Sequence, residues 1–249
     1  HLAQAGANVR MIDCDVIDVA TSVRFPHGYR DAGRLKVTTL HRRLVENWPT
    51  TQPEPHPMRV GAPRMSEGVP AQHELLNRLL ADADLIFDAT GNHAVGLFLS
   101  DCAARTGVPF VNVTTTFGCW GGRVMALRPR DGACFDCVYL HLDDRNNEHT
   151  PPEQRLIPPE APNGVIRPVG CGDATYSGTS FDAVPVVALG VRAAVSLLCD
   201  GEDGAYPPMR WNVATLWNRT YEGDPVAGRS HEFVLDRHED CTECARRSG

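Results

Sequence analysis

The sequence lacks the features that define membrane and nucleic-acid-binding proteins. Its longest apolar run, Val184 to Leu198, is interrupted by Arg192 and is too short to span a bilayer, so we expect no membrane segment. There is no dense block of Lys or Arg, and the formal net charge is -7. Because neutralising phosphates requires a basic surface, we expect no nucleic-acid partner.

Other absences limit the cellular compartment and the catalytic chemistry that we expect of the protein. No signal-like segment is found at the amino terminus, and the odd count of nine cysteines is typical of a reducing compartment, so we expect a cytoplasmic protein. Ten histidines include no His-Glu-x-x-His pattern, and we interpret His141 and His149 as solvated rather than catalytic. There is no internal repeat.

What is present is a composition typical of a soluble globular protein, with 42% hydrophobic and 22% charged residues. A chain of 249 residues can bury one large core. We therefore expect a single domain over residues 1–249, with a nucleotide-binding part over 1–130 and a C-terminal part over 131–249.

Two Cys-x-x-Cys pairs, Cys134-Phe-Asp-Cys137 and Cys241-Thr-Glu-Cys244, lie in the C-terminal half. Four thiolates form the tetrahedral ligand set that zinc prefers, and they leave no open coordination position. The pattern predicts a structural zinc that joins the C-terminal tail to the body of the protein. The alternative is four unrelated buried or redox-active cysteines.

Hydrophobic spacing predicts alternating strands and helices. Strands are expected at 8–13, 85–88 and 109–113, and helices at 32–48, 70–83, 93–107 and 180–198. Two further strands are expected at 209–217 and 232–236, and residues 1–6 resemble the end of a helix closed by Gly6. This alternation predicts an α/β fold with a Rossmann-like, mostly parallel sheet and helices on both faces. Residues 141–170, rich in proline and polar side chains, are expected to form a long functional loop.

Acids and cations follow the first predicted strand. Asp13-Cys14-Asp15 occupies the strand end at which a Rossmann fold commonly binds ribose, Arg24 follows, and Gly33-Arg-Leu-Lys36 comes next. Two cations near two carboxylates predict a polyphosphate site. Each residue alone could be an ordinary surface charge, and Asp88 alone an acid at a strand end that accepts backbone hydrogen bonds.

In this order the motifs resemble those of the ThiF/MoeB/HesA adenylyltransferases, the superfamily that includes ubiquitin-activating enzymes. Further matching segments are Thr21-Ser-Val-Arg24, residues 84–92, residues 117–124 and both cysteine pairs, so the resemblance covers essentially the whole chain. The sequence departs from the family at three points. The family's Gly-x-Gly-x-x-Gly loop would lie upstream of His1. This chain has Thr21 where the family has Asn, and it has Gly91 where the family often has the acid of an Asp-Asn pair.

The resemblance implies adenylation of the C-terminal carboxylate of a ubiquitin-like or sulfur-carrier protein, with ATP and Mg²⁺. Arg24 and Lys36 are the implied catalytic cations, and Asp13, Asp15 and Asp88 are the implied nucleotide and metal ligands. It also implies a homodimer and a possible conjugating enzyme as a further partner.

Cys171 follows the long loop and is flanked by glycines. Family members that form a thioester place their cysteine in or beside such a loop, so the resemblance implies that Cys171 is the nucleophile. The alternative is a buried small side chain. For Cys14, Cys102, Cys119 and Cys199, beside regular elements, we expect burial.

Three other functions stay open at this point. An enzyme of the same kind could adenylate a peptide or a tRNA-linked carboxylate and need no thioester. A degenerate pseudo-enzyme could bind the carrier without turnover. An NAD-dependent oxidoreductase is disfavoured by the paired cations and by the cysteine pairs.

Overall fold

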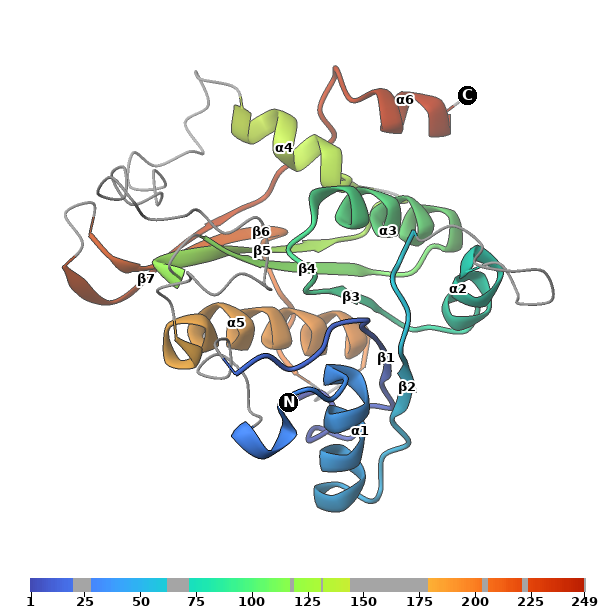
Figure 1. Cartoon of the computed structure of the whole chain (residues 1–249). Coiled ribbons are helices and arrows are strands. Elements are labelled where there is room, and N and C mark those ends of the chain that lie inside the picture. Colours follow the sequence, from blue (N-terminus) through green and yellow to red (C-terminus); the bar gives the residue numbers. More distant parts are fainter. Residues whose placement is uncertain are drawn as a thin grey trace, which may run out of the picture. The chain divides into compact units, whose positions relative to one another are not determined.

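The structure, a computed structural model, describes residues 1–19, 28–61, 72–116, 119–130, 132–143, 179–202, 206–220 and 224–248 (Figure 1). These residues fall in two compact units, His1–Asp82 and 83–248. Each unit has its own sheet.

The first unit is built on a parallel pair of short strands, β1 (Arg10–Ile12) and β2 (Glu54–His56). Between them the chain forms a 3₁₀ turn, η2 (Tyr29–Asp31), and helix α1 (Lys36–Asn47), and helix α2 (Gln72–Leu80) follows β2. Val37 and Leu44 of α1 are buried seven residues apart, which places them on one face of the helix. The connection is a β-α-β arrangement, of which the sequence predicts β1 and α1 but not β2.

The second unit contains a five-stranded sheet in the order β3-β4-β5-β6-β7. Its strands are β3 (Ile86–Asp88), β4 (Phe110–Thr115), β5 (Gly121–Leu127), β6 (Val213–Arg219) and β7 (Pro225–Phe233). The pair β3 and β4 is parallel, whereas the three later pairs are antiparallel. The α/β class is confirmed, but the sheet is mixed, because the few residues between β4 and β5 are too short for the crossover that a parallel pair needs.

Helices cover both faces of this sheet. Helices α3 (His93–Thr106) and α4 (Phe135–Asp143) lie on one side and α5 (Ser180–Leu198) lies on the other (Figure 1). Helix α5 approaches β4 and β5 closely, since a Cβ added at Gly190 would lie 2.3 Å from Val113. The short helix α6 (Thr242–Ser248) ends the described chain.

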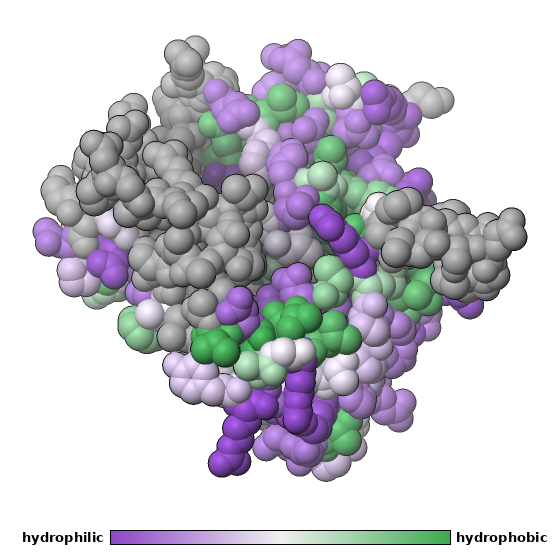
Figure 2. All heavy atoms as spheres, viewed as in Figure 1, coloured by the Kyte–Doolittle hydropathy of each residue, from purple (hydrophilic) through white to green (hydrophobic). Residues whose placement is uncertain are grey.

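Helix α5 extends further than the apolar run that we expected to be too short to span a bilayer. It has 19 residues, and by length and composition alone it is the one described helix that could cross a membrane. In this fold it packs on the sheet through residues such as Val186 and Ala194. Only 28% of its apolar stretch is buried. Figure 2 shows hydrophobic side chains at the surface of the face that it presents.

The predicted helices at 32–48, 70–83, 93–107 and 180–198 and the strands at 8–13, 85–88 and 109–113 are confirmed to within a few residues. The strand predicted at 209–217 begins at Val213, and the one predicted at 232–236 is wrong in extent, since β7 ends at Phe233. Residues 1–6 form turns rather than a helix end, with Gly6 at φ 97°. Helices α4 and α6 and strand β2 were not predicted.

Candidate functional site

The acids after β1 lie beside the lysine at the start of α1. Lys36 Nζ donates to Asp15 Oδ2 at 2.8 Å, and the Lys36 amide donates to the Asp15 carbonyl at the same distance. Only 11% of the Lys36 side chain is exposed, compared with 49% for Asp15. The interpretation of Lys36 as an ordinary solvated charge is therefore wrong, because its ammonium is held at the strand end.

Asp13 completes this cluster. Its Oδ1 accepts the Asp15 amide at 2.7 Å, and the side-chain ligand atoms of Asp13, Cys14 and Asp15 lie within 4.8 Å of one another. Burial raises the pKa of Asp13 above its ordinary value, and the hydrogen bond from the Asp15 amide opposes this effect. Two carboxylates at this spacing form a donor set that suits a magnesium ion.

Asp88 lies in the second unit and is only 1% exposed. Its Oδ1 accepts from the Thr90 amide at 2.9 Å and from the Thr90 hydroxyl at 2.7 Å, and its Oδ2 accepts from Asn112 Nδ2 at 2.8 Å. Both oxygens are thus engaged. In this conformation the carboxylate orders the turn between β3 and α3, where Asn92 caps the helix by accepting the Val95 amide.

Sequence reasoning did not single out a group of side chains on the α3 and α4 face of this sheet. Arg123 of β5 lies over the ring of Tyr139 of α4, with Cζ 5.5 Å from the ring centroid. The ring of His93 meets the same tyrosine edge-on at 4.5 Å. Burial raises the pKa of Tyr139 and lowers that of Arg123. The signal was available, since Arg123 is the one charge in the apolar run 121–127.

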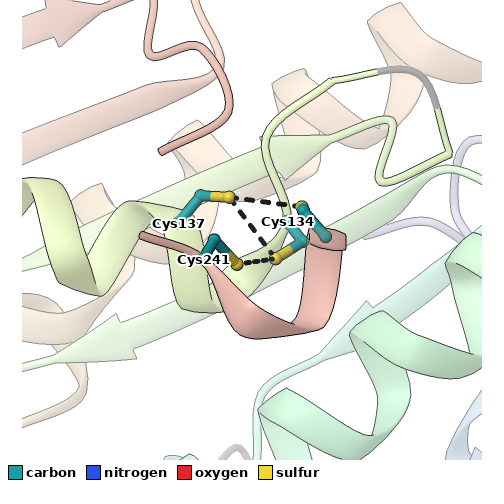
Figure 3. Close-up of side chains that lie close together, drawn as sticks. Cys134, Cys137 and Cys241 are labelled. Carbon is teal, nitrogen blue, oxygen red and sulfur yellow. Dashed lines mark hydrogen bonds between the residues drawn. The ribbon is translucent and has the colours of Figure 1, made fainter. Parts of the chain in front are cut away.

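The four paired cysteines come together in the second unit (Figure 3). Cys134 precedes α4, and Cys137 lies in the first turn of that helix. Likewise, Cys241 precedes α6 and Cys244 lies in its first turn. The Sγ atom of Cys134 lies 3.6 Å from those of Cys137 and Cys241, and that of Cys137 lies 3.4 Å from that of Cys244. All four are buried. The predicted grouping of the two pairs is confirmed.

The cluster is compatible with zinc. Thiolates bound at about 2.3 Å to one tetrahedral ion lie about 3.8 Å apart, close to the observed separations and far from the length of an S–S bond, about 2.05 Å. A hydrogen bond from Cys134 lowers the pKa of Cys137 to about 4 and raises that of Cys134, while burial raises the pKa of Cys241 to about 12. Of these three thiols, Cys137 is therefore the one that ionises most readily. A divalent cation would favour the thiolate form of all four cysteines.

Hydrogen bonds fix the segment that precedes the second cysteine pair, Cys241 and Cys244. Asn212 exchanges two bonds with the backbone of Leu235, at 2.7 and 2.8 Å. Arg237 Nη2 donates to the Arg130 carbonyl at 2.6 Å, and the His141 ring bonds to the Asp236 carbonyl at 2.9 Å. His141 is thus half-buried and bonded rather than solvated. The tail is joined to the body by backbone contacts as well as by thiols.

Other predicted residues divide into three groups. Arg24 and Cys171 lie outside the described residues, as do Thr21, His149 and most of the predicted loop at 141–170. Burial is confirmed for Cys102 and Cys119, and Cys199 is partly buried. The expectation for Cys14 is wrong: it is exposed, because it follows the end of β1 where the chain leaves the sheet.

Two solved structures illustrate the likeness of this fold to known proteins. The crystal structure of E. coli MccB with AMPCPP and MccA aligns with a TM-score of 0.62 and 16% identity, over 98% of this chain and 61% of MccB. PaaA aligns with a TM-score of 0.58 and 15% identity, over 94% of this chain and 67% of PaaA. These likenesses show that the chain has the same α/β fold as both proteins.

The family follows from the sequence match. The ThiF family matches residues 1–177, and this chain belongs to it. Two curated relatives from Sinorhizobium fredii (strain NBRC 101917 / NGR234), the uncharacterized proteins y4qC and y4oA, are 28% and 27% identical to it. Each match covers 97% of this chain and 40% of the relative, so the chain spans about two fifths of their length.

Proposed function

We propose that this chain adenylates the C-terminal carboxylate of a polypeptide with ATP. The observation that carries the proposal is the charged cluster in the first unit, where the ammonium of Lys36 is held 2.8 Å from Asp15 after a parallel strand of a ThiF-family chain. In such folds, ligands bind outside the carboxyl ends of parallel strands.

The reaction explains why cations are needed. A carboxylate oxygen bonds to the α-phosphorus of ATP as the bond to the β-phosphate breaks, and pyrophosphate leaves with its electron pair. Negative charge accumulates on phosphate oxygens, so fixed cations such as Lys36 and Arg24 stabilise the transition state more than an acid/base pair would. Asp13 and Asp15 would hold Mg²⁺, which neutralises phosphate charge, or the ribose, and Asp88 is the third proposed acid.

We further propose that Cys134, Cys137, Cys241 and Cys244 hold one zinc ion. With four thiolate ligands the ion has no open position for catalysis. Its role would be to hold α6 and the preceding segment against α4.

The first candidate for the substrate is a ubiquitin-like or sulfur-carrier protein, and the second is a short peptide or a tRNA-linked carboxylate. The second candidate gains support from the likeness to MccB, whose structures include one with MccA and AMPCPP. Carrier-dependent exchange of labelled pyrophosphate into ATP by the complete protein tests both, with carriers and peptides supplied as free acids or as C-terminal amides. Exchange with free acids only is expected. If none of the supplied substrates supports exchange while AMPCPP still binds, the result would favour an inactive carrier-binding protein.

Transfer to a cysteine is a separate proposal. We propose that the Cys171 thiolate attacks the carbonyl carbon of the acyl adenylate, so that a thioester forms as AMP leaves. A conjugating enzyme could then accept the acyl group. Cys171→Ala should leave pyrophosphate exchange intact and eliminate a thiol-sensitive band on a non-reducing gel. A band that persists would assign the nucleophile to another cysteine. Exchange without any band in the unaltered protein would favour direct transfer from the adenylate.

A homodimer and a cytoplasmic location complete the proposal. Support for the dimer comes from the exposed apolar side chains of α5, such as Phe181 at 73% and Val184 at 49% exposure. Support for a reducing compartment comes from the described cysteines, none of which is in a disulfide.

A further inference from the structure

Arg123 is a cation in the middle of an apolar strand. On β5 it lies between Gly122 and Val124, both buried, and its register partners are Thr114 on β4 and Thr215 on β6. The neighbours on either side along the strand face α5, since a Cβ added at Gly122 would lie 2.7 Å from Val186. Because side chains alternate along a strand, Arg123 points to the opposite face, which α3 and α4 cover.

The guanidinium lacks a partner for its charge among the described residues. Its Nε is buried and has no hydrogen-bond acceptor, and none of the ion pairs of the described chain includes Arg123. Tyr139 offers only its ring face, at 5.5 Å, and the exposed carboxylate of Asp143 acts from a longer range. An arginine keeps its charge under such conditions, and a half-buried charge without a counter-ion is costly to the fold.

The described polar side chains beside Arg123 on this face of the sheet are hydrogen-bonded to one another. Thr114, directly across from Arg123, donates its hydroxyl to Asn112 Oδ1 at 3.1 Å, and Asn112 in turn donates to Asp88. The Asp88 carboxylate is therefore committed to Asn112 and Thr90. This polar row runs along one face of β3, β4 and β5, toward the carboxyl end of β4 at Thr115.

We propose that Arg123 binds an oxyanion, a carboxylate or a phosphate, at the carboxyl end of β4 on the α3 and α4 face. The planar guanidinium fork matches both groups, because each offers two oxygens to two parallel N–H donors. The inference deepens the proposed function in one respect: a carboxylate that must approach a polyphosphate gains from a fixed cation that receives it. The site itself does not depend on turnover.

Direct binding to the complete chain tests the site. The probes are inorganic phosphate and acetate, each compared with chloride at equal ionic strength, and the readout is the Arg123 Nε–H signal in a ¹H–¹⁵N spectrum. We expect a saturable shift in the unaltered protein. Arg123→Met should lack the signal and lose the rise in melting temperature that the anion produces. Arg123→Lys should bind at least about tenfold more weakly, since it keeps the charge but loses the paired donors.

The matched control is Arg128→Met, which removes an exposed arginine that follows the same strand and pairs with Asp200. It should respond to anions as the unaltered protein does. A response to acetate alone assigns the site to the substrate carboxylate, and a response to phosphate alone assigns it to the nucleotide. An Nε–H signal that neither anion moves, or Arg123 variants that respond normally, would overturn the proposal. Anion binding without pyrophosphate exchange would instead remove only the proposed function.

Discussion

Lys36 and Arg34 are two cations two residues apart, and they differ in exposure and in their ion-pair geometry. Lys36 is held by Asp15 with 11% of its side chain exposed, whereas Arg34 is 55% exposed and lies 3.5 Å from Asp31. Exposed pairs of the second kind contribute little, about 0–1 kcal/mol. At the scale of single residues, Lys36 is thus the cation that the structure positions.

We predict that Lys36→Met lowers the rate of pyrophosphate exchange about 10²-fold or more, because one fixed contact to a charged transition state is lost. Arg34→Met is the matched control and should retain nearly full exchange. The measurement is labelled pyrophosphate incorporated into ATP by the complete protein. Equal rates in both variants would contradict the proposed role of Lys36 in binding the nucleotide.

Gly96 is the second residue with a specific steric role. A Cβ added there would lie 2.6 Å from Phe135 Cζ and 3.2 Å from Asp88 Oδ2. The first turn of α3 therefore packs directly on the start of α4 and on the buried carboxylate. A side chain at this position must displace an aromatic ring or break the polar row.

We predict that Gly96→Ala lowers the free energy of unfolding by about 1–3 kcal/mol, as overpacking of a core does. Gly132→Ala is the control, because its added Cβ would meet only the Arg128 carbonyl, at 3.5 Å. Its effect should stay within about 0.5 kcal/mol. Urea denaturation of both variants measures the difference. Equal midpoints would show that the Phe135 ring can move aside without lowering the free energy of unfolding.

At the scale of elements, the cysteine cluster joins two helix starts that are far apart in the chain. Each pair contributes one thiol before a helix and one in its first turn, where backbone N–H groups favour negative charge on sulfur. Helix α6 has seven residues and is too short to be stable alone. Its place depends on the cluster and on the Arg247 pair with Asp101 at 3.3 Å.

We predict one zinc per chain, and none in the double variant Cys241→Ser with Cys244→Ser. Zinc at about 100 times its Kd should stabilise the unaltered protein by about 2.7 kcal/mol and the double variant by nothing. Cys199→Ser, which changes a cysteine outside the cluster, should keep the metal. Elemental analysis after gel filtration measures the stoichiometry, and full zinc retention by the double variant would contradict the four-thiolate site.

At the scale of the whole molecule, α5 carries two apolar faces. One packs on the sheet, and the other presents a row at spacings of three and four residues: Phe181, Val184, Ala188, Val191, Val195 and Leu198. The two exposed ends of the row are Phe181 and Leu198, at 73% and 40% exposure. This spacing is the one by which two helices pack at a small angle, so the row can pair with the same row of a second copy.

We predict that Phe181→Asp combined with Val184→Asp converts the proposed dimer to a monomer, because two buried carboxylates would face their copies across the interface. Val234→Asp is the control, since Val234 is 66% exposed and lies outside α5. Light scattering gives the mass, and circular dichroism checks that the helices persist. A monomeric unaltered protein would refute the dimer.

Much of the fold follows from the sequence because the responsible interactions are local. Hydrophobic spacing predicts helices α1, α3 and α5 to within a few residues, since one buried face recurs every three or four positions. Helix α4 was missed because residues 135–143 are followed by a polar stretch, and β7 was placed late because eight of its nine residues are at least partly exposed.

The sequence by itself determined the positions of helices α1, α2, α3 and α5, the matching spacing of the two cysteine pairs and the succession of Asp13, Asp15 and Lys36. These depend on neighbours along the chain. Tertiary structure alone decided the pairing of β5 with β6, the exposure of Cys14 and the face on which Arg123 lies. Strand pairing and burial join residues distant in sequence, such as Arg123 with Thr215, and no local pattern specifies which of them meet.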